Sequence, residues 1–125
     1  MPPRRTWLAK FADAFRGLLT GIRCERNFAV HLAFAAAVVL LAFVLRVTLV
    51  EWCLLAICIT IVLAAELLNT AIERLAHEVS RDHNPEVGAA LDMASGSVLI
   101  TAIGSAIVGS LILGYRCGLL IGWWG

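Results

Sequence analysis

The sequence contains few charged residues. Charged side chains account for 15% of its 125 residues, whereas hydrophobic side chains account for 61%. With a mean hydropathy of +0.89, the chain carries more apolar surface than a water-soluble domain of this length has interior to bury. The sequence therefore predicts a single integral membrane domain over residues 1–125. No nucleic-acid partner is expected at a net charge of +1.

Familiar motifs of soluble enzymes are also missing. The sequence contains no GxxxxGKS/T loop, no GxGxxG turn and no HExxH pair, so no common nucleotide or zinc motif is present. The cysteines form no CxxC pair and show no metal-ligand spacing, and we expect them to be structural. They are Cys24, Cys53, Cys58 and Cys117. No small-residue cleavage site follows the first apolar run, so no cleavable signal peptide is expected.

Apolar runs dominate what is present. Three runs, at about 28–45, 52–70 and 93–115, are long enough to cross a bilayer as helices. Before them, residues 6–24 place aromatic and aliphatic side chains on one helical face and basic ones on the other, which is typical of a helix on the membrane surface. The same face is equally able to pack on the rest of the protein. The expected fold class is an all-α membrane protein with a surface helix and three transmembrane helices.

Basic residues are concentrated before the first span. The loop after this span contains only Arg46, whereas six basic residues precede it: Arg4, Arg5, Lys10, Arg16, Arg23 and Arg26. The positive-inside rule therefore predicts a cytoplasmic N-terminus in the inner membrane. With three spans, the loop between the second and third spans lies on the cytoplasmic side as well, where ATP is available.

The region from the end of the second span to the start of the third breaks the apolar pattern. It holds six of the nine carboxylates and two of the three histidines. On a helix, five polar residues fall within about 100° of arc. This polar stripe consists of Glu66, Asn69, Thr70, Glu73 and His77. Carboxylates at membrane depth are usually functional, and Glu66 is the deepest of them, with no basic partner evident nearby.

The residue types of the stripe suit phosphoryl transfer to a lipid. Desolvated Glu66 is a candidate general base for a hydroxyl group within the bilayer. Glu73, together with Glu25 at the end of the surface helix, offers oxygen ligands for Mg²⁺, which completes its shell with phosphate and water oxygens. Asn69 is suited to positioning by hydrogen bonds, and Asp92 can border the same pocket from the third span.

Each candidate also has another explanation. Glu73 is alternatively a solvated carboxylate that pairs with Arg74 of a neighbouring chain. Asp92 is alternatively an acidic residue that the dipole of its own helix stabilises. His31, one turn inside the first span, is expected to be structural. An ion or proton transporter that uses Glu66 as a carrier is a further alternative, although coupling sites tend to lie near the bilayer midplane.

Two segments resemble the small integral-membrane kinases of bacteria, which are the prokaryotic diacylglycerol kinases and the related undecaprenol kinases. They are AELLNTAIERL (65–75) and ALDMASGSVLI (90–100), preceded by FRGL (15–18) and ERNFAVH (25–31). The most specific part is E-x-x-N-S/T-x-x-E within the polar stripe, and ERNFAVH looks more like the undecaprenol kinase branch. The resemblance implies a homotrimer that uses Mg²⁺ and transfers the γ-phosphoryl group of ATP to diacylglycerol or undecaprenol.

The resemblance also implies a role for each residue, in a site shared between neighbouring subunits. Catalysis falls to Glu66 and Asn69, with Glu66 as the general base, and Mg²⁺ binding falls to Glu25 and Glu73. The implied nucleotide-binding residues are Glu25, Glu73, His77, Asp92 and Arg16. The implied contacts to the lipid are Glu66, Asn69 and Ser95.

One departure from the family pattern bears on the chemistry. Where the family usually has a lysine directly before the aspartate that corresponds to Asp92, this chain has Leu91. A cation at the transferred phosphoryl group is therefore missing, and such a cation normally stabilises the charge of that group. The sequence offers Arg81, or Arg16 and Arg23, in its place. A catalytically impaired relative that acts as a structural membrane trimer is the alternative that Leu91 favours.

Overall fold

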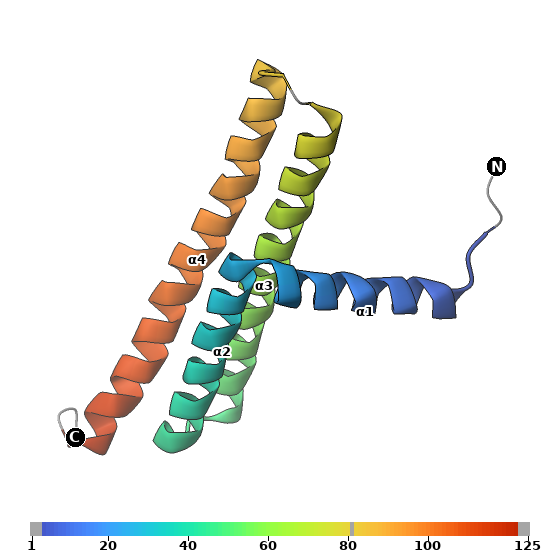
Figure 1. Ribbon diagram of the computed structural model, residues 1–125. Helices are drawn as coiled ribbons and strands as arrows, with labels where there is room; N and C mark the ends of the chain where they lie inside the picture. Colours follow the sequence, from blue (N-terminus) through green and yellow to red (C-terminus); the bar gives the residue numbers. More distant parts are fainter. Residues whose placement is uncertain (1–3, 81, 123–125) are drawn as a thin grey trace.

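The computed structural model describes residues 4–80 and 82–122, and this part of the chain forms four α-helices. They are α1 (Trp7–Cys24), α2 (Arg26–Leu45), α3 (Leu49–Val79) and α4 (Pro85–Leu120). Helices α2, α3 and α4 run side by side, and α1 projects sideways from this bundle (Figure 1). The expected fold class is confirmed, because α2, α3 and α4 are each long and apolar enough to cross a membrane.

Three of the four helices begin at a polar side chain that binds their first backbone amides. The hydroxyl of Thr6 accepts a hydrogen bond at the start of α1. Thr48 and Glu51 form a reciprocal capping box at the start of α3. Asn84 caps α4, with Pro85 at its first position. Pro85 fits this first position, because a proline there has no amide hydrogen to satisfy.

Helices α3 and α4 are longer than a bilayer requires. They contain 31 and 36 residues, whereas about 20 residues span the hydrocarbon core. Both extend beyond the level at which α1 leaves the bundle, and a short loop joins them there (Figure 1). The polar stripe therefore stays helical as it leaves the apolar part of α3, as its spacing predicts.

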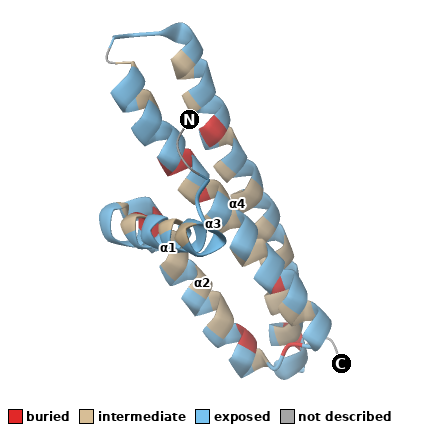
Figure 2. Cartoon of the chain, turned by 90° about the vertical axis from the view of Figure 1, so that its right-hand side faces the viewer, coloured by how far each residue is buried: buried red, intermediate tan, exposed pale blue. Residues whose placement is uncertain are grey.

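Most large apolar side chains of the single chain are exposed, and pale blue marks the exposed residues along all four helices in Figure 2. A small apolar cluster of Ala42, Val47 and Leu55 is buried where α2 turns into α3. A helix bundle with an apolar outer surface needs lipid or other protein chains around it rather than water. The chain is therefore a membrane protein.

An ion pair joins the two helix ends that lie opposite the polar stripe. Both Nε and Nη2 of Arg116, near the end of α4, donate to Oε1 of Glu51 at 2.8 and 2.6 Å. The two side chains are only 22% and 17% exposed. Because Glu51 also caps α3, the pair fixes the start of α3 against the end of α4.

Replacing Glu51 by Gln should lower the stability of the bundle. The variant leaves the guanidinium of Arg116 without a charged partner, which lowers the free energy of unfolding. Reversible unfolding of the detergent-solubilised protein in SDS measures the loss. The double variant Glu51→Gln/Arg116→Gln should lose less than the sum of the two single variants. Additive losses would show that the two side chains do not stabilise the bundle through each other.

Candidate functional site

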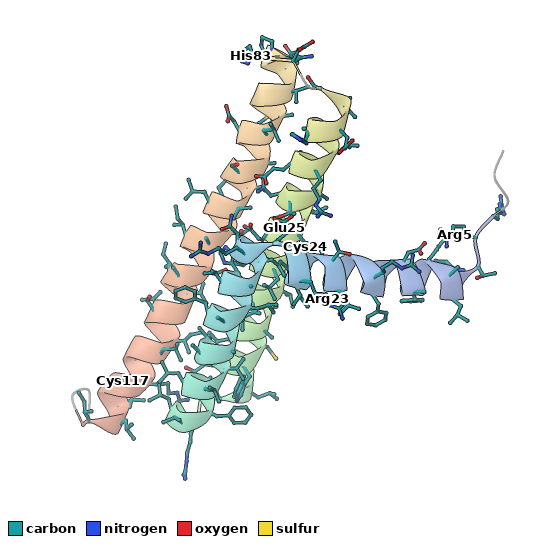
Figure 3. All side chains as sticks on the ribbon, in the orientation of Figure 1. Arg5, Arg23, Cys24, Glu25, His83 and Cys117 are labelled. Carbon is teal, nitrogen blue, oxygen red and sulfur yellow. The ribbon has the colours of Figure 1, made fainter. Side chains whose placement is uncertain are left out.

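The packing of α1 and α2 on α3 forms a polar corner of the molecule. Glu25 follows the last residue of α1 and is the N-cap residue of α2. Figure 3 shows it at the bend between these helices, beside α3. Gly21 allows the bend to approach α3 closely, because an added Cβ atom there would lie 2.7 Å from Cδ1 of Leu67. The bend therefore holds Glu25 near the polar stripe.

The polar stripe passes from a buried to an open environment. The side chains of Glu66, Asn69 and Thr70 are buried, with exposures of 3%, 8% and 7%. Glu73 and His77, which lie further along α3, are exposed. A ligand with an apolar tail and a polar head matches such a gradient, because its two parts find different surroundings on the same helix.

Glu66 has a basic partner that the sequence did not reveal. Nε2 of His31 on α2 lies 3.5 Å from Oε2 of Glu66. The expectation that no such partner exists is therefore wrong. The side chain of His31 is 27% exposed and that of Glu66 is 5% exposed. His31 thus brings an imidazole from α2 to this buried carboxylate.

The side chain of Asn69 is only half satisfied. Its Nδ2 donates to Oε1 of Glu73 at 3.0 Å. Its Oδ1 is buried and has no hydrogen-bond partner among the described residues. A buried carbonyl oxygen without a partner is unfavourable by itself. Asn69 is thus oriented to accept a hydrogen bond from a ligand while it holds Glu73 in place.

Glu25 is paired with an arginine of the same chain. Nε of Arg74 lies 3.4 Å from Oε1 of Glu25, and the two side chains are 56% and 29% exposed. The sequence leaves open a pair between Glu73 and Arg74 of a neighbouring chain. Within one chain, Arg74 contacts Glu25 instead, and Glu73 accepts a hydrogen bond from Asn69. The contact ties α3 to the bend between α1 and α2 and places a guanidinium among the carboxylates.

The carboxylates of this corner fit a metal ion that arrives with a phosphate ligand. The described residues contain no group of three or more His, Cys, Asp or Glu side chains close enough to hold a metal ion. Mg²⁺ needs only one or two carboxylates when phosphate and water oxygens complete its shell. Glu25 and Glu73 provide such carboxylates, and the unpaired Oδ1 of Asn69 adds an oxygen atom beside Glu73.

Three hollows open along the polar side of α3. One of about 630 Å³ lies against α1 and is lined by Glu25, Thr70 and Arg74 among others. A second, of about 550 Å³, is lined by Glu73, Arg74, His77 and Glu78. A third, of about 270 Å³, lies between α3 and α4 and includes Glu73, His77 and Leu91. Neighbouring hollows share lining residues and so adjoin one another, and the hollow against α1 is also lined by apolar side chains such as Leu18, Leu67 and Leu68.

An apolar cavity lies on the membrane side of the same site. It has a volume of about 320 Å³, lies between α2, α3 and α4, and has His31 at one end. Its other lining residues, such as Phe34, Leu55 and Gly109, are almost all apolar. The contact between His31 and Glu66 thus lies where an apolar cavity approaches a polar surface.

Some predicted site residues lie apart from this cluster within one chain. Asp92 and Ser95 are exposed, and neither forms an ion pair or a side-chain hydrogen bond in the described part of the chain. Arg16 pairs with Asp13 on α1 at 3.2 Å. Arg81 lies outside the described residues. One chain thus gathers Glu25, Glu66, Asn69, Glu73 and His77.

His31 and Arg74 were missed as partners of the site, although each has a signal in the sequence. His31 lies one turn after Phe28, which is buried beside Gly21 of α1. Arg74 lies four residues after buried Thr70 and shares its face of α3. The sequence position of His31 or of Arg74 indicates a contact with another helix only when the way the helices cross is known.

Comparisons with known proteins show the family of the chain. Residues 12–113 match the family model described as prokaryotic diacylglycerol kinase. The undecaprenol kinase of Bacillus subtilis is 39% identical over 102 residues, which cover 82% of this chain and 83% of that protein. The diacylglycerol kinase of a Synechocystis species is 33% identical over 107 residues, which cover 85% of this chain and 61% of that protein. The chain therefore belongs to the prokaryotic diacylglycerol kinase family of membrane lipid kinases.

Proposed function

We propose that the chain transfers the γ-phosphoryl group of ATP to the hydroxyl group of a membrane lipid. The observation that carries this proposal is the place of Glu66. Its carboxylate is buried and lies 3.5 Å from His31, which lines the apolar cavity. A lipid with its hydrocarbon chain in this cavity presents its hydroxyl group to Glu66, while the nucleotide stays on the open polar surface.

Glu66 acts as the general base in this proposal. It accepts the proton of the lipid hydroxyl as the oxygen attacks the γ-phosphorus atom of ATP. His31 stabilises the carboxylate and orients it from α2. Oδ1 of Asn69 accepts a hydrogen bond from a bound water molecule, because that atom has no partner among the described residues.

Glu25 and Glu73 hold Mg²⁺ together with the phosphates of ATP. When bound, Mg²⁺ neutralises negative charge on the transferred group. Asn69 keeps Glu73 in position through the hydrogen bond of 3.0 Å. His77 lines the adjoining hollows and contacts the nucleotide from the same face of α3.

The active protein is proposed to be a homotrimer in the cytoplasmic membrane. Asp92, Ser95 and Arg16 complete the site from neighbouring chains, since they lie apart from Glu66 in one chain. The exposed apolar surface of the bundle supports this assembly. Space beside α4 supports it too, because a Cβ atom added at Gly104 or Gly114 meets nothing within 4 Å. The basic N-terminal region places the N-terminus and the site on the cytoplasmic side.

Undecaprenol is the proposed acceptor, and diacylglycerol is the second candidate. The Bacillus subtilis undecaprenol kinase has the higher identity of the two relatives, and the matched region covers 83% of it. The Synechocystis diacylglycerol kinase supports the second candidate at 33% identity. An apolar cavity alone discriminates weakly between hydrocarbon chains, so both lipids belong in the assay.

Replacing Glu66 by Gln should lower lipid phosphorylation at least about 100-fold, because the amide cannot accept the proton of the hydroxyl group. Transfer of labelled phosphate from ATP to undecaprenol or diacylglycerol, with and without Mg²⁺, measures the effect. Light scattering should find three chains per particle for the wild-type protein and for Glu66→Gln. The matched control is Glu86→Gln, at the exposed start of α4. Normal turnover by Glu66→Gln would contradict its role as the base, and no product from wild-type protein would favour a structural trimer.

Replacing Leu91 by Lys should raise the rate and should not lower it. Leu91 shares a hollow with Glu73 and His77, so a lysine there adds positive charge beside the nucleotide site. Rates at saturating ATP for Leu91→Lys and the uncharged control Leu91→Met separate the effect of charge from that of packing. A large loss confined to the lysine variant would show that the phosphates bind elsewhere.

A further inference from the structure

Arg74 lies where the site needs a positive charge. Leu91 leaves the nucleotide site without the family's lysine, and three carboxylates of the cluster add negative charge next to the phosphates of ATP. Among the ion pairs of residues 4–80 and 82–122, the contact between Arg74 and Glu25 is the one that joins an arginine or lysine to a predicted site carboxylate. The missing charge is therefore present on α3 rather than on α4.

The guanidinium of Arg74 is open to a ligand. Its Nε lies 3.4 Å from Glu25, and its terminal nitrogens form no hydrogen bond within the described part of the chain. The side chain is 56% exposed. It lines both the hollow against α1 and the hollow beside Glu73. Arg74 is the lining residue that these two hollows share, with Glu25 in the first and Glu73 in the second.

We propose that Arg74 binds the phosphates of the nucleotide and supplies the positive charge that position 91 lacks. This inference rests on the proposed function. Guanidinium groups match the geometry of phosphate oxygens and keep their charge under all physiological conditions. In the free protein Arg74 neutralises Glu25. When the nucleotide binds, the guanidinium turns to the phosphates, and Glu25 becomes available to the metal ion.

Two of the arginines proposed from the sequence lie in the described part of the chain, and neither contacts a site carboxylate there. Arg16 is engaged with Asp13 on α1. Arg23 forms no ion pair with any carboxylate of residues 4–80 and 82–122. Arg74 instead follows Glu73 directly in the sequence and reaches Glu25 across the corner. Its position thus links the two carboxylates that are proposed to bind the metal ion.

Two binding measurements without lipid test the proposal on the full-length protein in detergent. Calorimetry measures the affinity for a non-hydrolysable ATP analogue with Mg²⁺, and electron paramagnetic resonance measures the affinity for Mn²⁺ alone. Arg74→Ala should bind the analogue about tenfold more weakly, because it loses a charge-assisted contact. It should bind Mn²⁺ at least as tightly as wild type, since Glu25 is no longer neutralised. Arg74→Lys should retain most of the nucleotide affinity.

Moving the charge provides a second test. Arg74→Ala/Leu91→Lys should recover most of the nucleotide affinity lost by Arg74→Ala, since it restores a cation at the family's usual position. The matched control is Arg46→Asn, which removes an arginine at the opposite end of the bundle and tolerates the left-handed backbone there, at φ 53°. It should bind both ligands as wild type does.

Three results would overturn the proposal. The first is an unchanged nucleotide affinity in Arg74→Ala. The second is an equal loss of affinity for the ATP analogue and for Mn²⁺ in this variant, which would show that Arg74 is a purely structural link between α3 and the bend. The third is a loss of nucleotide affinity in Arg23→Ala when Arg74→Ala keeps its nucleotide affinity. Wild-type protein that binds the analogue through Arg74 but phosphorylates no lipid would contradict the proposed function alone. Wild-type protein that binds no nucleotide would overturn both.

Discussion

The close packing of the bend between α1 and α2 on α3 is the contact on which the site depends. Gly21 lies at this contact, and a Cβ atom there would lie 2.7 Å from the end of the Leu67 side chain, which would have to shift. The bend brings Glu25 to Arg74, and the first turns of α2 bring His31 to Glu66. Without this packing, the carboxylates of α3 lie along a membrane helix with no partners from other elements.

The continuity of α3 explains how one helix serves two environments. Its first part lines an apolar cavity, its middle buries Glu66 and Asn69, and its end carries exposed Glu73 and His77. A lipid kinase needs this gradient, since its acceptor lies in hydrocarbon and its donor in water. The ion pair between Glu51 and Arg116 holds the other end of α3 against α4, which keeps the helix in register along its length.

Local patterns in the sequence predicted the helices and the polar stripe, because helical periodicity and apolar length depend only on neighbouring residues. The family resemblance is confirmed by the family match. The contacts of Glu66 with His31 and of Glu25 with Arg74 escaped prediction, because they depend on how helices cross. The same holds for Glu51 and Arg116, which are 65 residues apart. Asp92 and Ser95 remain predictions, since a single chain does not bring them to the cluster.

The most direct test of this account compares two glycines of α1 in the lipid phosphorylation assay. A Cβ atom at Gly21 meets Leu67, whereas one at Gly17 meets nothing within 4 Å. Gly21→Val should push the bend away from α3 and lower turnover at least about tenfold, because displacing catalytic groups by about 1 Å costs far more than that. Gly17→Val, with the same change in helix propensity, should keep most of its activity. Equal activity in the two variants would contradict the claim that this packing builds the site.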